Sequence, residues 1–156
     1  MLDRRSKAAM IPYCANHGVG LMTYGALCHG LFSGVWDAET VFPSEDWRST
    51  GDVFGLPLFA GDNLRHNIGV ATRLAAFAES LGLSLPQLAI AWVAHNTYIA
   101  TALAGMRSAA EVEENVKAVT VRPSSDDLAS VDAILASAVG NQGMSHYVVN
   151  ERAGER

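Results

Sequence analysis

The sequence contains little cysteine, little positive charge and no long apolar run, and each shortage excludes a class of protein. Its two cysteines, Cys14 and Cys28, do not have the spacing of a CxxC redox pair and do not indicate a disulfide framework. Sixteen acidic against eleven basic residues give a net charge of -5, which argues against a nucleic-acid surface or a basic membrane-binding face. No apolar run approaches the ~18 residues that a membrane span requires, and the N-terminus lacks the apolar segment of a signal peptide. These features predict a cytoplasmic protein.

The composition is that of one packed globular domain. The chain has 156 residues, of which 49% are hydrophobic and 17% are charged, so it can bury a core. Two short apolar runs, residues 19–24 and 99–104, are typical of buried parallel strands. The tail, residues 140–156, shows no clear pattern. Apolar positions at helical spacing, bounded by caps and glycines, predict helices over residues 3–17, 62–82, 84–95, 108–119 and 125–139.

The helix expected from residue 108 follows a strand and begins with a capping pattern. Ser108 and Glu111 are expected to form a capping box, in which each side chain bonds to the other residue's backbone amide. The free amides and the dipole of this helix start favour a negative group, and Arg107 offers a forked donor that suits phosphate. Residues 99–115 therefore predict an anion site, although strand, glycine and capped helix also occur in α/β proteins that bind no phosphate. Asp3 and Asp62 are the expected caps of the first two helices.

Two segments without regular periodicity can also carry function. Residues 24–34 hold three glycines, at which the backbone can turn sharply or approach a ligand. Residues 35–61 form a long excursion, and loops of this length are often functional. Its aromatic residues Trp36, Trp47 and Phe54 are expected to pack in the core or at its rim, with the wall of a substrate pocket as the alternative.

The order of the expected elements favours an α/β fold with parallel strands and right-handed crossovers. Two buried strands cannot make a sheet whose faces and edges are all covered, and a closed barrel of this class takes eight strands and about 250 residues. The chain therefore looks like the end of a longer structure. The side chains of Leu21, Thr23, Ile99 and Thr101, or of their neighbours, are expected to lack packing partners.

Several stretches of the sequence together resemble one protein family. They are LDRR from Leu2, IPYC, GVGLMTYGALCHGLFSG, the helices from Asn67 to Trp92 that end in QLAIAWV, AGMRSAAEVEENV and SSDDLASVD. Over residues 2–137 the combined pattern resembles the aldo-keto reductases, NADP-dependent oxidoreductases that fold as a (β/α)8 barrel. Only the C-terminal part of that family is matched. The resemblance therefore implies a partial TIM barrel, with two parallel strands and surrounding helices, over residues 1–139, followed by the tail of residues 140–156.

The resemblance also implies which parts of the family's active site are absent. Residues 19–24 and 99–104 correspond to the seventh and eighth barrel strands, whereas the catalytic Asp, Tyr, Lys and His of the family lie on the first six. Tyr24, Lys117 and the five histidines do not match those motifs, so no catalytic residue is expected here. The residue at the place of Met1 is internal in the family, which leads us to expect a start codon within a longer gene or a deletion.

Part of an NADP site remains by the same resemblance. Arg107 matches the family's ligand for the 2′-phosphate, and Glu114 and Asn115 match the residues that meet the adenine. The loop after the first strand matches the family's pyrophosphate loop, but without its serine hydroxyl, so only backbone donors are retained. Glu111 stands where Gln is usual and adds a negative charge within one turn of that phosphate. The expected cofactor-binding residues are Gly25, Ala26, Leu27, Gly30, Gly105, Arg107, Glu111, Glu114 and Asn115.

Three functions are compatible with this pattern. The chain can be part of a reductase that uses NADP(H) and a small carbonyl substrate, inactive by itself. It can be a non-catalytic nucleotide-binding or interaction module that forms a homo-oligomer through open strand edges. It can also be an enzyme completed by assembly into an oligomer or by a separate N-terminal half. No nucleic-acid or membrane partner is expected. A zinc site formed by Cys14, His17, Cys28 and His29 is disfavoured, because adjacent ligands in a loop do not readily converge on one ion. No nucleophile elbow indicates a hydrolase.

Overall fold

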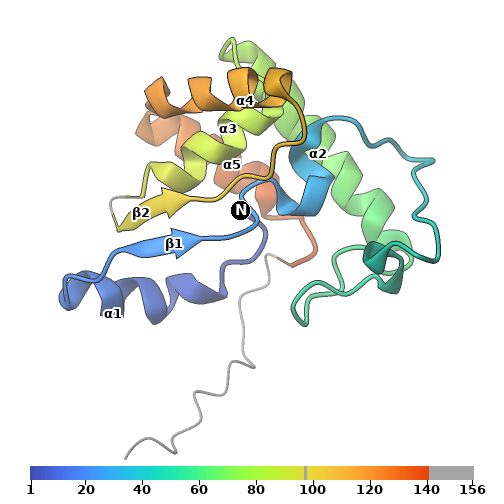
Figure 1. The fold of residues 1–156 in the computed structure, drawn as a ribbon, viewed down its shortest axis with the longest axis horizontal. Helices are drawn as coiled ribbons and strands as arrows, with labels where there is room; N and C mark the ends of the chain where they lie inside the picture. The colour runs from blue at the N-terminus through green and yellow to red at the C-terminus, as the bar shows by residue number, and fades with distance from the viewer. Residues whose placement is uncertain (97, 141–156) are drawn as a thin grey trace, which may run out of the picture.

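Two short parallel strands lie at the front of the computed structural model, which describes residues 1–96 and 98–140 (Figure 1). Strand β1 (Leu21–Thr23) pairs with β2 (Ile99–Ala102), and no further strand joins this sheet within the described residues. Figure 1 shows no helix in front of the two strands. Of the expected tail, residues 141–156 lie outside the described part of the chain.

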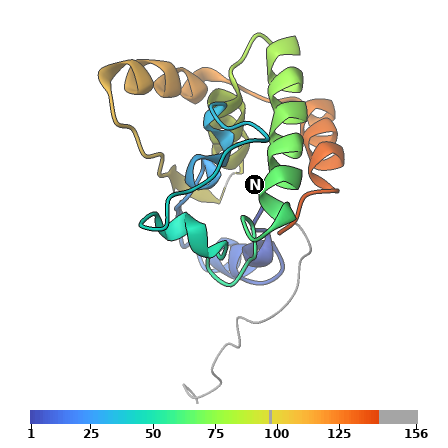
Figure 2. The same ribbon diagram turned by 90° about the vertical axis from the view of Figure 1, so that its right-hand side faces the viewer.

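Helices lie beside and behind this sheet. Figure 1 shows α1 on the side of β1, and α3 and α4 on the side of β2. Helices α2 and α5 lie side by side behind them (Figure 2). This arrangement agrees with the expected pair of parallel strands with surrounding helices. The α-helices are α1 (Met10–Asn16), α2 (Asp62–Ser80), α3 (Leu85–Ala94), α4 (Ala109–Val116) and α5 (Ser125–Leu135).

The starts of α3, α4 and α5 follow from local side-chain chemistry, whereas α1 and α2 begin without a side-chain cap. Ser84 and Ser124 each form a full capping box, with Gln87 and Asp127 respectively, at the starts of α3 and α5. The expected cap of α2 by Asp62 is wrong. Asp62 is the first helical residue, and Gly61 turns the chain into the helix with a φ of 52° that an L side chain rarely adopts.

The first expected helix, over residues 3–17, is also wrong in its extent. The structure has a short 3₁₀ turn, η1 (Arg5–Lys7), followed by the separate helix α1. The Asp3 carboxylate accepts hydrogen bonds from the backbone N–H of Arg5 at 3.1 Å and from the guanidinium of Arg5 at 2.9 and 2.7 Å. Asp3 therefore stabilises the short turn and does not cap one continuous helix.

Both strands are shorter than expected, and their pairing is parallel. Leu21 pairs with Ile99 and Met22 with Thr101, with an irregularity in the register between them. Beyond the strand ends, the N–H of Leu103 donates to the carbonyl oxygen of Thr23 at 2.8 Å. The exposed strand residues are Met22, Ala100 and Thr101. Of the residues expected to lack packing partners, only Thr101 is exposed; the other two exposed residues are their neighbours.

The main core lies where α2, α3 and α5 meet the loop after β1. Phe32, Leu74 and Leu135 are fully buried there, and Leu88 from α3 packs in the same cluster. A smaller cluster joins α3 to the strands through Ile90, Ala91 and Val93. No single described helix is long and apolar enough to span a membrane, and α2 and α3 pass that test only as a pair bent by 87°. The buried apolar residues of these two helices belong to the two clusters.

A buried asparagine ties α2 to two segments that are distant in the sequence. The Asn67 side chain is fully buried, and its Nδ2 donates to the carbonyl oxygens of Leu58 at 2.9 Å and Val139 at 3.3 Å. Its Oδ1 accepts from the backbone N–H of Val139 at 2.9 Å. One side chain therefore fixes both the segment that enters α2 and the segment that follows α5, and it satisfies their backbone groups.

We expect Asn67→Ala to lower the free energy of unfolding by about 2–3 kcal/mol, because it leaves buried backbone groups without partners. The control is Asn63→Ala, which removes an exposed hydrogen bond from Nδ2 to the carbonyl oxygen of Pro57 and should cost about 1 kcal/mol or less. Urea denaturation monitored by circular dichroism measures both values. Equal losses of unfolding free energy in the two variants would show that the buried Asn67 bonds stabilise the fold no more than one exposed hydrogen bond.

Candidate functional site

Two of the expected ligand-binding segments meet at one end of the sheet. Because β1 and β2 are parallel, the loops that follow them leave from the same edge, where active sites of parallel α/β barrels lie. Ala26 and Leu27, after β1, pack in the same apolar cluster as Ala104, after β2. The segments 25–30 and 105–115 thus both begin at the same edge of the sheet.

The loop after β1 is tightly folded and lacks side-chain donors at the expected contact positions. It enters the 3₁₀ segment η2 (Cys28–Ser33), in which Cys28 and His29 have left-handed φ values of 49° and 57°. Gly30 has a φ of 108°, and a Cβ atom built there would lie 2.7 Å from Cζ2 of Trp36. Gly30 is thus required for its conformation and for the close approach of Trp36.

At the start of α4, an ion pair joins Arg107 and Glu111. Ser108 is the N-cap, and its Oγ accepts from the Glu111 backbone N–H at 3.2 Å, as expected. The Glu111 carboxylate, however, accepts from the backbone N–H of Arg107 at 2.7 Å and from Nη2 of Arg107 at 3.2 Å. The expectation that the Glu111 side chain bonds to the Ser108 amide is therefore wrong, because it bonds to the amide of the preceding residue, Arg107. These contacts, above all the backbone hydrogen bond, lower the pKa of Glu111.

Glu114 and Asn115, further along α4, are held against the body of the chain. Oε1 of Glu114 accepts from Nε2 of Gln87 on α3 at 2.9 Å, and Oε2 accepts from Nζ of Lys117 at 3.0 Å. The hydrogen bond from Lys117 is the largest cause of a lowered pKa of Glu114. The Asn115 side chain is buried on the inner side of α4. By contrast, the Arg107 side chain is 85% exposed, so it is the accessible cation of this segment.

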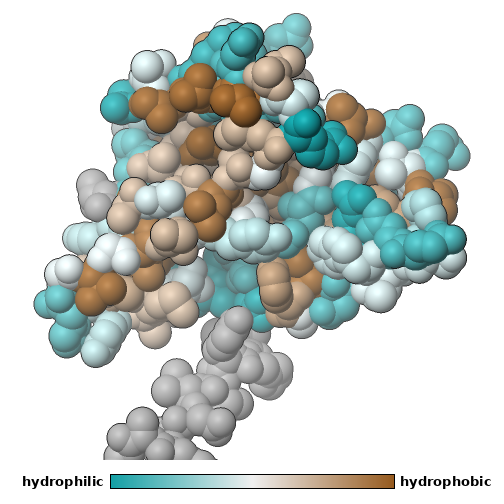
Figure 3. All heavy atoms as spheres, in the orientation of Figure 1, coloured by the Kyte–Doolittle hydropathy of each residue, from teal (hydrophilic) through white to brown (hydrophobic). Residues whose placement is uncertain are grey.

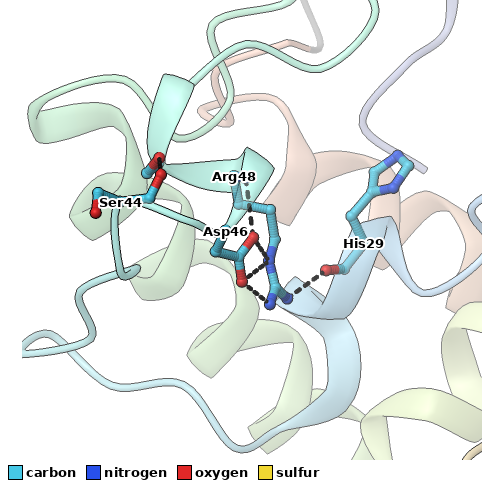
Figure 4. Close-up of polar contacts among 5 residues, drawn as sticks. His29, Ser44, Asp46 and Arg48 are labelled. Atoms are coloured by element: carbon cyan, nitrogen blue, oxygen red, sulfur yellow. Dashed lines mark hydrogen bonds and ion pairs between the residues drawn. The ribbon is translucent and has the colours of Figure 1, made fainter.

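An arginine that the sequence analysis did not select holds the loop after β1 in place. The guanidinium of Arg48 pairs with the Asp46 carboxylate and donates from Nη1 to the carbonyl oxygen of His29 at 3.2 Å (Figure 4). It also lies 4.7 Å from the ring centroid of Phe42. The hydrogen bond from Arg48 lowers the pKa of Asp46 to about 2. The Asp-x-Arg sequence amid aromatic residues was the pattern that could have indicated this clamp.

The aromatic residues of the long excursion divide into two groups. Trp36 packs against Phe42 and Phe59, with ring centroids 5.0 and 5.7 Å away, and belongs to the main core. Trp47 and Phe54 are more than half exposed, and both contact His29 beside the loop after β1. Trp36 therefore packs in the core, whereas Trp47 and Phe54 pack at its rim.

The described residues include no group of three or more His, Cys, Asp or Glu side chains that could hold a metal ion. Cys14 and Cys28 are free and buried. Burial raises the pKa of the Cys28 thiol to about 12, so this sulfur stays protonated at neutral pH. Neither cysteine has the environment of a nucleophile or a metal ligand.

Comparison with known proteins gives a consistent match. The sequence pattern of the Aldo/keto reductase family matches residues 1–136. A probable voltage-gated potassium channel subunit beta from Arabidopsis thaliana is 31% identical over 118 residues, which are 72% of this chain and 34% of that protein. A glycerol dehydrogenase from Gluconobacter oxydans is similar in structure, with a TM-score of 0.78 and 30% identity over 93% of this chain.

A second solved structure, an aldo-keto reductase from Bacillus halodurans, shares the fold with a TM-score of 0.54 and 23% identity over 90% of this chain. The chain covers 42% of each of the two solved proteins, so it spans less than half the length of these relatives. Its two parallel strands and helices are therefore a part of a TIM barrel. Taken with the family pattern over most of the sequence, this similarity shows that the chain belongs to the aldo/keto reductase family.

Proposed function

We propose that this chain carries the adenosine end of an NADP site in an oxidoreductase that interconverts a small carbonyl compound and its alcohol. The observation that carries the proposal is the exposed Arg107 at the start of α4, in the segment that follows β2, in a member of this family. Helix N-termini favour phosphate, and an arginine there adds a forked, permanently charged donor.

Each expected residue has a distinct task in this site. Arg107 binds the 2′-phosphate, Glu114 and Asn115 meet the adenine, and Gly105 lets the backbone approach the cofactor. The backbone of Gly25, Ala26, Leu27 and Gly30 lies along the pyrophosphate without a side-chain hydroxyl. When bound, the nicotinamide ring of the cofactor supplies or accepts the hydride. Glu111, the remaining residue of the set, pairs with Arg107 and affects only the binding of the 2′-phosphate.

The residues for proton transfer are not among the cofactor-binding residues that we assign to this chain. We assign no catalytic residue within residues 1–139, the part that we place in the barrel, because the family's catalytic Asp, Tyr, Lys and His have no counterparts there. The chain by itself is thus a cofactor-binding part of the enzyme, inactive without the rest of the barrel. The cytoplasm is the compartment we propose, which agrees with two cysteines that are both free.

A second candidate function is an interaction module, and the open face of the sheet favours it. Met22 on β1 is 68% exposed, and Val112, Val116 and Val119 along α4 and the turn after it are 47–66% exposed. Figure 3 shows hydrophobic side chains over α4 and over the strands on the same face. Parallel sheets are normally covered on both faces, and strand edges recruit partners. A complementing N-terminal half, or a second copy of this chain, would cover this face.

To test the cofactor site, we expect Arg107→Met to weaken NADPH binding about ten-fold, because a charge-assisted contact to the 2′-phosphate is lost. Isothermal titration calorimetry of the purified chain measures the affinity. Arg65→Met removes an arginine that is also exposed, on α2, and serves as the matched control with unchanged affinity. An Arg107→Met protein that binds NADPH as tightly as the unchanged chain would contradict the site.

The purified chain is expected to reduce no aldehyde with NADPH above the rate in buffer, because no catalytic residue accompanies the cofactor site. The assay follows NADPH absorbance with a series of aliphatic and aromatic aldehydes. A full-length aldo-keto reductase is assayed in parallel to show that each substrate is competent. Turnover by the purified chain alone would overturn the assignment of no catalytic residue.

If the open face binds a partner or a second copy, charge placed on it should prevent association. We expect Val116→Lys and Met22→Lys each to shift the protein toward the monomer, because a buried unpaired charge is costly. Val41→Lys, at an exposed valine of the long excursion, is the control. Light scattering coupled to size-exclusion chromatography measures the molar mass. Equal mass for all four proteins, at the value of a monomer, would count against self-association.

A further inference from the structure

The carboxylate of Glu111 accepts hydrogen bonds from two donors of Arg107, the residue that we propose to hold the 2′-phosphate. One oxygen accepts from the backbone N–H of Arg107 at 2.7 Å, and the other accepts from its Nη2 at 3.2 Å. The amide and the guanidinium of the same residue thus already hold an anion. That anion belongs to the chain itself and lies within the first turn of α4.

The position of Glu111 is fixed by more than the ion pair. Its own backbone N–H donates to Oγ of Ser108 at 3.2 Å, which anchors the residue in the first helical turn. A carboxylate near a helix N-terminus is also stabilised by the helix dipole. Moving the side chain away would leave the Arg107 amide without this acceptor, so an incoming phosphate would have to replace a formed set of hydrogen bonds.

The charges around Glu111 offer no compensation for a second anion. Helix α4 also carries Glu113 and Glu114, and the nearest following cation, Lys117, pairs with Glu114 at 3.0 Å. A phosphate monoester carries about -1.5 to -2 charges at neutral pH. With Glu111 ionised beside it, repulsion between like charges opposes the attraction of Arg107. As they stand, these residues weaken the hold of Arg107 on a 2′-phosphate without abolishing it, because Glu111 engages only Nη2 of a guanidinium that is 85% exposed.

We propose that Glu111 is a specificity-determining residue, which competes with the 2′-phosphate for Arg107 so that NAD(H) binds at least as tightly as NADP(H). The inference rests on the proposed function, since it concerns which nicotinamide cofactor the same site prefers. The rest of the site, namely the pyrophosphate loop and the adenine contacts, is common to both cofactors and does not distinguish them.

The test compares the binding of NADPH and NADH to three forms of the chain by isothermal titration calorimetry. For the unchanged chain, the dissociation constant for NADPH should equal or exceed that for NADH. Glu111→Gln should tighten NADPH about ten-fold and leave NADH within about two-fold, because the amide oxygen still accepts from Arg107 without repelling phosphate. Glu113→Gln removes an exposed charge from the same helix. It should change neither the dissociation constant for NADPH nor that for NADH.

Other results separate the inference from the proposed function. A ten-fold or greater preference for NADPH in the unchanged chain, with the same ratio in Glu111→Gln, would overturn the role of Glu111 and leave the cofactor site intact. Equal effects of Glu111→Gln and Glu113→Gln would reduce the role to net charge and would also overturn it. Binding of neither cofactor by any form would overturn the proposed function, and the inference with it.

Discussion

The parallel pairing of β1 with β2 determines where every functional segment of this chain lies. The two strands run in the same direction, with Leu21 paired to Ile99, so both strands end at the same edge of the sheet. The loop that begins at Tyr24 and the loop that contains Gly105 therefore leave the sheet together. Between them the chain runs through the long excursion, α2 and α3, and α3 packs against β2 to complete the crossover. Antiparallel pairing would place the two loops at opposite ends of the sheet.

Arg48 performs a second organising task, because it joins the long excursion to the loop after β1. Its guanidinium satisfies the Asp46 carboxylate and the His29 carbonyl while it lies near the rings of Trp36 and Phe42. The lowered pKa of Asp46 keeps this pair charged through the neutral range. The pKa of His29 is lowered chiefly by burial and also by Arg48, so its ring stays neutral there. Arg48 thus holds the loop through a backbone carbonyl and not through the His29 ring.

Local sequence patterns predicted the starts of α3, α4 and α5, whereas contacts between distant segments could not be predicted. Ser84, Ser108 and Ser124 cap helices because their hydroxyl groups reach amides three residues away. Asp62 failed as a cap because Gly61 supplies the turn through its backbone alone. The Asn67 bridge to Leu58 and Val139 depends on tertiary packing.

In the site, local patterns placed Arg107 and Glu111 in one turn but missed their bond to each other. Of the contacts of Arg48, only its pairing with Asp46 has a local sequence signal, because its partners at residues 29, 36 and 42 follow no period in the sequence. The expected roles of Glu114 and Asn115 stay predictions. Their side chains are engaged with α3 and with the interior, which no pattern on α4 alone could show.

The open face of the sheet and the composition of the site have one physical origin. A parallel sheet of two strands leaves Met22 and the α4 valines uncovered, and in a closed barrel further strands would lie against such a face. Those strands would also bring additional side chains to the shared carboxyl edge. In the function that we propose, binding of the adenosine end and reaction at the nicotinamide end therefore depend on different surfaces. Because of this separation, the charge balance between Arg107 and Glu111 can be measured as binding alone, without any contribution from the chemical step.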